Sequence, residues 1–403
     1  MQHSEVKKFN PPKLLLADLL FFVALGCILY KDFFIMQLGV HFEIIGIILI
    51  IFLAVFSNQE SKQTIFNKKI ILIITFFIVF SWIGSSIVIL TLNTSSYYAA
   101  FAISIVILRM RPKYLIETLT VLVTINTLFQ ILESLTGEFI FVYVDDDFSY
   151  DEKMLSTSDG GLRTKGLYGS PLNGIGVAMS LCFLAPKSKY SWFLLCASSL
   201  LGQGRLGLGI GIVGLLVNLF RSHTGLKAHA IKTLLSLSVF LLLIASWMAL
   251  FATEDSVTRM LEAGSADNSQ NISRFEFWLS SINQLINYDL ISLIFGKFGY
   301  IKAFQGGTES DWLRMWLDNG FIFFLTVLSL IIYRLYVAAR KKDWLNFYAS
   351  SACIFVMAVY PHAQSFPNGL LTWLFLLSKF DINSIKKITY SEKKIIPSLN
   401  RNI

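Results

Sequence analysis

Long apolar runs separated by short polar connections dominate this chain. A helix needs about 20 apolar residues to cross the hydrocarbon core of a bilayer, and fewer where its end lies in a protein cavity. The pattern therefore predicts an all-α, polytopic transmembrane helical bundle of about twelve spans, forming one integral membrane domain over residues 1–403. The predicted spans are 14–30, 38–57, 70–91, 95–108, 114–135, 166–185, 190–204, 206–220, 233–252, 320–339, 344–360 and 364–380.

Composition strengthens this prediction. The 403 residues are 55% hydrophobic and only 15% charged, with a mean hydropathy of +0.62, whereas soluble domains carry about a quarter charged residues. Disordered chains, disulfide scaffolds and nucleic-acid-binding modules are excluded, because each needs polarity or cysteine content that is missing here. The four cysteines lie inside apolar runs without metal-ligand spacing, so packing is favoured over redox chemistry.

The net charge of +8 reflects the distribution of basic residues. With a cytoplasmic N-terminus, the alternate connections and the C-terminal tail hold most of the 34 lysines and arginines, and the outer connections hold most of the acids. This distribution follows the positive-inside rule and places both termini in the cytoplasm. Two long outer loops remain, 136–165 and 253–319. Function is expected there, because loops carry sites on a helical scaffold.

Arg205 is the most unusual charged residue. It lies in "LGQGRLGLGIG", between two predicted spans of about 15 residues, which rise only about 22 Å. Arg205 should therefore lie below the outer surface, where a guanidinium faces a watery cavity, binds a partner or snorkels. The motif GQGRLG is not read as a dinucleotide site, since that fingerprint needs a soluble strand and helix; its glycines favour close helix packing.

Three more basic residues lie in the outer loops. Arg163 and Lys165 precede the glycine-rich segment "GLYGSPLNGIG". Arg163 suits either an anion site or solvent, whereas a solvated charge is preferred for Lys165. Arg274 follows Ser273, a plausible N-cap of an interfacial helix that carries apolar residues at helical spacing. Arg274 either points into the same cavity as Arg205 or lies on the surface.

Acidic residues accompany these arginines. Residues 309–316 are predicted to form a helix, and Glu309 and Asp311 would stabilise its first turn through the helix dipole. That role leaves unexplained why they lie beside three arginines. Glu133 lies near a predicted span end, where snorkelling accounts for it. His362, between the last two spans, either binds sugar or caps a turn, and the turn is preferred.

These residue types fit transfer from a phosphate-linked donor. Arginines hold a diphosphate bidentately and neutralise the charge that develops as it leaves. A carboxylate can take the proton from an attacking hydroxyl. The acids at 145–147 lack the clustered histidines or fixed spacing of a metal site, so neither a metal nor a cofactor is expected.

The order of several short motifs resembles the O-antigen polymerase (Wzy) family and the related O-antigen ligases. The likeness covers about residues 160–340 and consists of the segments "RTKGLYGSPLNGIG", "GQGRLGLG", "SRFEFW", "LIFGKFGY" and "TESDWLRMWLDNGFIFFL". It implies a bacterial inner-membrane glycosyltransferase that acts at the periplasmic face. The donor would be a glycan linked to undecaprenyl diphosphate, and membrane lipids, a flippase and a chain-length regulator would be its partners.

The resemblance also implies roles for individual residues. Arg163, Arg205 and Arg274 match family arginines that would clamp the diphosphate. Glu309 stands where ligases commonly carry histidine, which favours a polymerase and makes Glu309 the candidate base or acceptor-orienting group. Asn173 departs from the pattern, because many relatives have proline directly before this asparagine. The further substrate-binding candidates are Asp311, Arg314, Asn173 and His362.

The resulting hypothesis is a surface polysaccharide polymerase that transfers a growing glycan to the non-reducing end of a lipid-linked repeat unit. Two alternatives remain. An O-antigen ligase would pass the finished chain to a lipid acceptor, and a non-enzymatic flippase or transporter would move lipid-linked oligosaccharide across the bilayer without needing a base.

Overall fold

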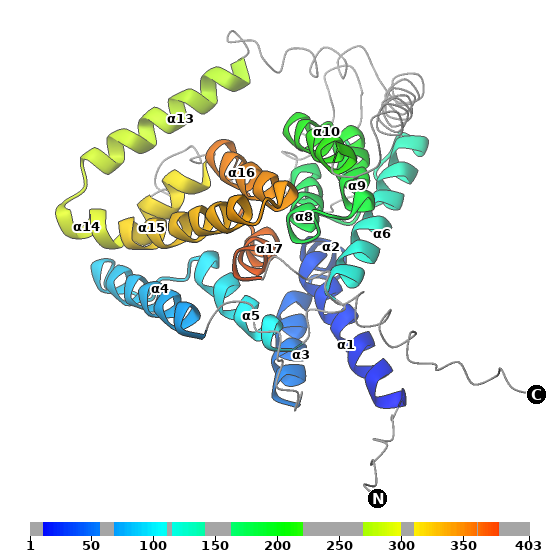
Figure 1. The fold of residues 1–403 in the computed structure, drawn as a ribbon, viewed down its shortest axis with the longest axis horizontal. Helices are drawn as coiled ribbons and strands as arrows, with labels where there is room; N and C mark the ends of the chain where they lie inside the picture. The colour runs from blue at the N-terminus through cyan, green and yellow to red at the C-terminus, as the bar shows by residue number, and fades with distance from the viewer. Residues whose placement is uncertain are drawn as a thin grey trace, which may run out of the picture.

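The described part of the chain is built from helices (Figure 1). The computed structural model describes residues 11–56, 68–110, 115–141, 163–220, 269–299, 310–360 and 362–378, among which no strand occurs. This confirms the all-α prediction. The helices are α1 (Pro11–Leu29), α2 (Lys31–Leu38), α3 (Phe42–Phe56), α4 (Lys68–Val88), α5 (Ser96–Met110), α6 (Leu115–Thr136), α8 (Pro171–Leu184), α9 (Lys189–Leu201), α10 (Arg205–Phe220), α13 (Ser269–Ile286), α14 (Leu290–Phe295), α15 (Asp311–Arg340), α16 (Trp344–Val359) and α17 (Phe366–Leu377).

Three described helices are long and apolar enough to cross a membrane, namely α4, α6 and α15. A fourth candidate is the pair α1 and α2, which bends by 72° between its members. Six further helices are apolar but shorter, at 10–17 residues. These lengths are compatible with a membrane protein, whereas the predicted count of twelve spans is not confirmed. The predicted span 233–252 lies outside the described residues.

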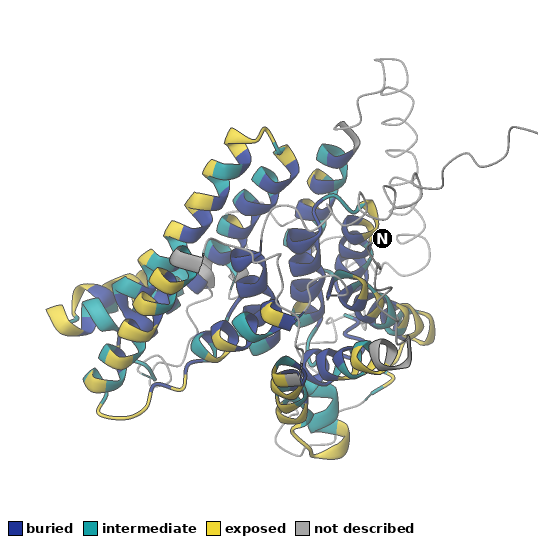
Figure 2. Cartoon of the chain, turned by 60° about the horizontal axis from the view of Figure 1, so that its bottom comes forward, coloured by how far each residue is buried: buried dark blue, intermediate teal, exposed yellow. Residues whose placement is uncertain are grey.

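The outer surface of the bundle carries large apolar side chains. On α4, Leu72 is 72% exposed and Ile87 66% exposed, and on α3 Val55 is 71% exposed. Figure 2 shows exposed residues along the periphery and buried residues in the interior. Extended apolar surfaces are costly in water, but they match the acyl chains of a bilayer.

Helices α8 and α17 lie in the centre of the bundle. Nearly every residue of both is buried. The two helices approach closely at Gly176 of α8, which has no side chain. A Cβ at this position would lie only 2.9 Å from the Asn368 Cγ of α17. Ser170 caps α8 by accepting a hydrogen bond from the Asn173 backbone N–H, and Pro171 begins the first turn, where a missing N–H costs nothing.

Glycines also bring α9 and α10 together, as the sequence predicted. A Cβ on Gly211 would lie 2.7 Å from the Sγ of Cys196. All four cysteines are free and buried, which confirms that they serve packing. The GQGRLG motif thus spans the turn from α9 into α10 and the first residues of α10, and the described elements around it are helices.

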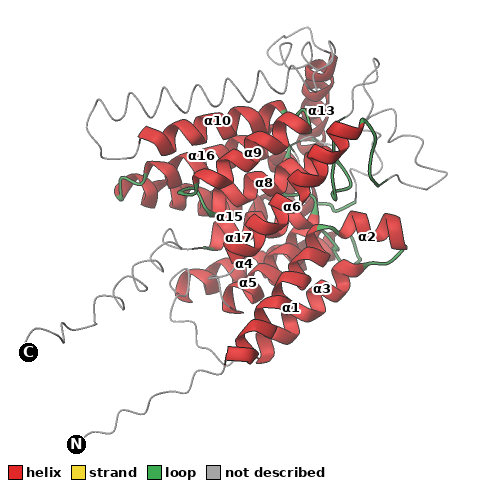
Figure 3. Cartoon of the chain, turned by 90° about the vertical axis from the view of Figure 1, so that its right-hand side faces the viewer, coloured by secondary structure: helices red, strands yellow, loops and turns green. Residues whose placement is uncertain are grey.

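Several predicted boundaries are wrong. The run 38–57 contains a break: α2 ends at Gly39, which adopts a left-handed conformation with φ 64°, and α3 begins only at residue 42. Ser273 is not the N-cap of the helix in the second outer loop, because α13 begins at Ser269. By contrast, α15 begins at residue 311, in agreement with the helix predicted at 309–316, and bends at Gly320, where the next span is predicted to begin. Figure 3 shows α2 pointing away from the direction of α1.

Candidate functional site

The segment that contains Arg163 is fixed by the end of α6. One carboxylate oxygen of Glu133 accepts hydrogen bonds from the backbone N–H groups of Lys165 and Gly166, each at 2.8 Å. Asn126 accepts another from Leu167, also at 2.8 Å. Glu133 is fully buried, so snorkelling does not explain it. Backbone N–H groups in a buried loop need hydrogen-bond partners that a helix or sheet would otherwise provide, and the Glu133 carboxylate supplies them here.

Lys165 also differs from its expected solvated state. Its side chain is 1% exposed, and its Nζ lies 4.7 Å from the centroid of the Phe139 ring. An ammonium at this distance is attracted by the negative face of an aromatic ring. The charge of Lys165 is therefore part of the packed structure around Glu133. Arg163, two residues earlier, is half-buried.

The first turn of α8 contacts α2. The side-chain amide of Asn173 donates to the Asp32 carboxylate at 3.2 Å. Gly169 lies at the same contact between the two segments. A residue with a side chain would not fit there, because its Cβ would lie 2.7 Å from the Asp32 Cβ. Asn173 thus holds α8 and α2 together, and its binding of substrate remains a prediction.

Arg205 is the first residue of α10 and is half-buried. The turn that precedes it packs against the start of α8: a Cβ on Gly202 would lie 3.4 Å from the Pro171 Cβ and 3.2 Å from the Ile175 Cδ1. The turn is closed by the Gly204 backbone N–H, which donates to the Ser199 carbonyl at 2.7 Å. Arg205 and the segment containing Arg163 therefore approach the same end of α8.

Asp311 links three elements at the start of α15. Its carboxylate accepts a hydrogen bond from the Tyr97 hydroxyl of α5 at 2.8 Å. The other oxygen accepts from the Ala363 backbone N–H, between α16 and α17, at 2.6 Å. The side chain is fully buried. These contacts reach beyond its own first helical turn, so dipole stabilisation alone does not describe Asp311. A contact with substrate remains a prediction.

One turn further along α15, Arg314 pairs with Asp318. The guanidinium Nε lies 3.2 Å from the carboxylate. The backbone around Asp318 accepts hydrogen bonds from α4, because Ser85 donates to the Asp318 carbonyl at 3.3 Å and Ser81 donates to the Asn319 carbonyl at 2.6 Å. Arg314 thus lies in a polar layer between α4 and α15, with its charge balanced by a neighbouring acid.

His362 is fully buried beside α8. Its Nε2 lies 3.0 Å from the Ser180 hydroxyl, and burial lowers its pKa to about 4. The ring is therefore neutral at pH 7. Its backbone N–H donates to the Tyr360 carbonyl at 2.8 Å, within the connection between α16 and α17. The ring thus bonds to α8, and turn capping and sugar binding both remain predictions.

The side chains of two predicted site residues cannot be placed. Arg274 belongs to α13, but its side chain is outside the described part of the structure, and Glu309 lies wholly outside it. Convergence of Arg163, Arg205, Arg274 and Glu309 on one pocket therefore remains a prediction. Among the described residues, no group of three His, Cys, Asp or Glu side chains has the arrangement of a metal site.

The described candidates lie toward one end of the bundle. At this end, which we term the site end, α6, α9 and α16 finish while α8, α10, α15 and α17 begin. The bond of Glu133 and the packing of Gly202 against Pro171 join the ends of α6, α8, α9 and α10, and the bond of Asp311 joins the start of α15 to the connection between α16 and α17. His362 lies deeper, beside Ser180, nine residues or about 14 Å along α8 from Pro171.

The opposite end, which we term the basic end, contains the connections from α8 to α9 and from α15 to α16. Lys187 and Asp343 join these connections through an ion pair of 3.2 Å. Buried Arg334 donates to the Ser378 carbonyl at the end of α17, at 2.6 Å. Basic residues collect here within the described chain: Arg109, Lys187, Lys189, Arg334, Arg340, Lys341 and Lys342.

Comparison with known proteins gives no family for this chain. No family model matches it, and no curated protein or solved structure is significantly similar to it.

Proposed function

We propose that this protein is a membrane glycosyltransferase that polymerises oligosaccharide units linked to undecaprenyl diphosphate. The observation that carries the proposal is the gathering of buried and half-buried charged residues at the site end, opposite an end rich in lysine and arginine. Under the positive-inside rule, the basic end faces the cytoplasm and the site end faces the periplasm of a bacterial inner membrane. The proposal includes twelve spans and two cytoplasmic termini.

In the proposed reaction, Arg163, Arg205 and Arg274 hold the diphosphate of the growing chain. Their guanidinium groups stabilise the negative charge that develops on this leaving group. Glu309 accepts the proton of a hydroxyl at the non-reducing end of a newly supplied unit. That hydroxyl oxygen bonds to the anomeric carbon as the carbon's bond to the diphosphate oxygen breaks, and undecaprenyl diphosphate is released.

Substitution of Glu309 tests the proposal. In vesicles that contain the purified protein and lipid-linked repeat units, Glu309→Gln should bind substrate but no longer elongate it, because the amide accepts no proton. Glu138→Gln is a matched control, since it removes an exposed carboxylate that has no role in the reaction. Undiminished elongation by Glu309→Gln would reject Glu309 as the base. Transbilayer movement of labelled substrate by wild-type protein without elongation would instead indicate a flippase, and transfer of chains to a lipid acceptor would indicate a ligase.

The same assay tests Arg205. Arg205→Lys keeps the positive charge but not the planar pair of donors that binds a diphosphate, so elongation should fall by about tenfold or more. Lys189→Arg at the basic end serves as the control and should retain activity. Full activity of Arg205→Lys would argue for a structural role of this arginine.

A further inference from the structure

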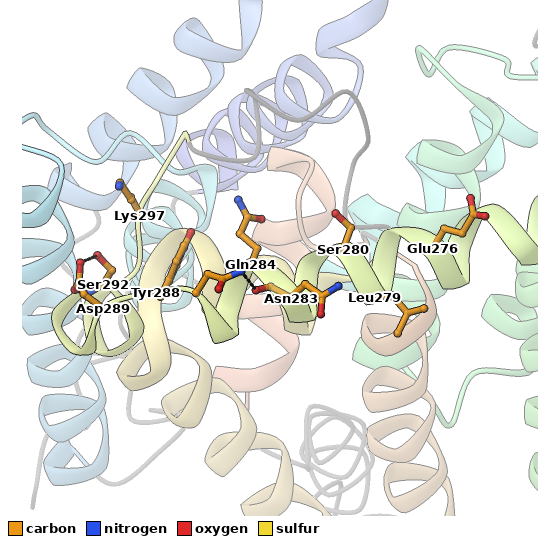
Figure 4. A pocket seen from close by; sticks show the side chains of 10 residues that line it. Glu276, Leu279, Ser280, Asn283, Gln284, Tyr288, Asp289, Ser292 and Lys297 are labelled. Carbon is orange, nitrogen blue, oxygen red and sulfur yellow. Dashed lines mark hydrogen bonds between the residues drawn. The ribbon is translucent and has the colours of Figure 1, made fainter.

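A polar cavity of about 510 Å³ lies along α13 (Figure 4). Its size falls within the range of about 300–1,000 Å³ that small-molecule sites occupy. None of the candidate residues predicted from sequence lines it. It is bounded by one side of α13, by the start of α14 and by Lys297, which follows α14.

The lining residues carry groups that recognise sugar hydroxyls. Asn283, Gln284 and Asn287 supply carboxamides, Ser280 supplies a hydroxyl and Glu276 supplies a carboxylate. Carboxamide and carboxylate groups both accept hydrogen bonds, and carboxamides also donate them. They therefore suit the adjacent hydroxyls of a sugar, which donate and accept hydrogen bonds as well. Figure 4 shows Glu276, Ser280 and Gln284 projecting from the same side of α13.

Gln284 gives this cavity an unused donor. Its side-chain nitrogen is buried and has no hydrogen-bond partner among the described residues. A buried polar group without a partner is destabilising, because it has lost its hydrogen bonds to water. Rotation of the carboxamide toward a ligand oxygen in the cavity would relieve that cost. The aromatic ring of Tyr288, which also lines the cavity, offers an apolar surface for the C–H face of a sugar ring.

The charges disfavour a diphosphate in this cavity. The lining includes two carboxylates, Glu276 and Asp289, but a single lysine. The backbone N–H and hydroxyl of Ser292 donate to Asp289 and lower its pKa, so it remains ionised at pH 7. A site with a net negative charge repels an anion and accepts a neutral, hydroxyl-rich molecule.

The position of α13 explains how such a ligand would remain attached to a membrane lipid. A second side of α13 carries Phe275, Leu279, Ile282 and Ile286, which are 43–73% exposed. A third side packs on the bundle through Ser281 and buried Leu285. An amphipathic helix of this kind lies in the membrane interface with its apolar side toward the acyl chains. The polar cavity would then open at the level of lipid headgroups.

We propose that this cavity is a glycan-binding subsite that holds a neutral sugar ring of the lipid-linked substrate, away from the diphosphate. The inference rests on the proposed function for the identity of the substrate, whereas the binding itself does not depend on catalysis. Gln284 and Asn283 contribute hydrogen bonds, Tyr288 contributes ring stacking, and α13 fixes the height of the cavity relative to the bilayer.

Binding measurements on the full-length protein in nanodiscs test this subsite. The first probe is the free oligosaccharide that mild acid releases from the cell's lipid-linked repeat units, and the second is undecaprenyl diphosphate without sugar. Gln284→Ala and Asn283→Ala should each weaken oligosaccharide binding by about tenfold, the value of roughly one hydrogen bond. Both should leave undecaprenyl diphosphate binding unchanged, which also shows that the variants are folded.

Gln37→Ala is the matched control, because Gln37 is an exposed carboxamide on α2 outside the cavity. Equal oligosaccharide affinity for Gln284→Ala, Asn283→Ala and wild type would overturn the subsite. Elongation assays separate this result from failure of the proposed function. A wild-type protein that binds oligosaccharide through Gln284 but never elongates it would keep the subsite and reject the polymerase.

Discussion

Buried ionisable side chains in this protein are held by groups distant in sequence. Glu133 binds backbone N–H groups 32 and 33 residues later, and Asp311 binds the Ala363 N–H 52 residues later. A carboxylate that accepts such bonds recovers part of the free energy lost on leaving water. Each of these acids therefore fixes an irregular segment onto a helix, close in sequence to a proposed catalytic or substrate-binding residue.

His362 predicts a measurable dependence of stability on pH. Its pKa is about 4 in the folded protein, compared with about 6.5 when unfolded. Between these values the unfolded chain binds a proton that the folded chain does not bind, so stability is lost as the pH falls. The loss approaches about 1.4 kcal/mol per pH unit below pH 6.5.

Thermal unfolding in detergent between pH 7 and pH 5 measures this effect. The unfolding temperature of His362→Gln should fall less steeply over this range than that of the wild type, because the glutamine does not titrate. The other four histidines remain in both proteins and cancel in the comparison. Parallel curves would show that His362 is not held neutral by burial.

Residue-level prediction from sequence did not reveal the contacts of the candidate residues. Asp311 and His362 were recognised as unusual polar residues near an outer connection. Their partners, Tyr97 and Ser180, lie in apolar runs where a hydroxyl carries no recognisable signal. Glu133 and Lys165 were misinterpreted for the same physical reason, because burial of a charge depends on tertiary partners that helical periodicity does not reveal.

At the scale of elements, the junction of α14 and α15 depends on two glycines. Gly296 ends α14 with φ 80°, and Gly320 breaks α15 with φ 83° and ψ 171°. A Cβ on Gly320 would lie 2.5 Å from the Phe295 Cα. The backbones of α14 and α15 therefore pack directly against each other here, with no side chain between them. This contact positions α14, and with it one boundary of the polar cavity.

Gly320→Ala should destabilise the protein by about 1–3 kcal/mol through backbone strain, with a further cost from displacement of α14. Gly137→Ala is the control, because Gly137 also has a positive φ, 72°, but a Cβ there meets nothing within 4 Å. Unfolding temperature in detergent should therefore fall more for Gly320→Ala. An equal fall would mean that backbone conformation alone, without the contact to α14, requires the glycine.

Element-level prediction was accurate where apolar runs were long and weak where they were interrupted. The run 114–135 corresponds to α6 within a residue at each end. The helix predicted at 309–316 and the span predicted from 320 form the two parts of α15, which meet at the bend at Gly320. Helix α14 was not predicted, because six residues fixed by an Asp289 cap and by packing on α15 have little periodicity of their own.

The molecule as a whole has two chemically different ends. Buried acids, Arg205 and the polar cavity lie apart from the connections that contain Lys187 and Lys342. Retention of lysine and arginine in the cytoplasm during insertion accounts for such an asymmetry. An enzyme that receives lipid-linked glycans outside the cytoplasm needs the same asymmetry, because its site must open on one side only. Orientation in the membrane is therefore the property on which the proposed function depends most.

Cysteine labelling in cells tests this orientation. The four native cysteines are buried, so they should react slowly with a membrane-impermeant maleimide. Glu138→Cys introduces an exposed thiol after α6 at the site end, and Lys342→Cys introduces one between α15 and α16 at the basic end. We expect Glu138→Cys to be labelled in right-side-out membrane vesicles and Lys342→Cys only in inverted ones. Labelling of both positions from one side would mean that the two ends do not face opposite compartments, and the periplasmic transferase would lose its topological basis.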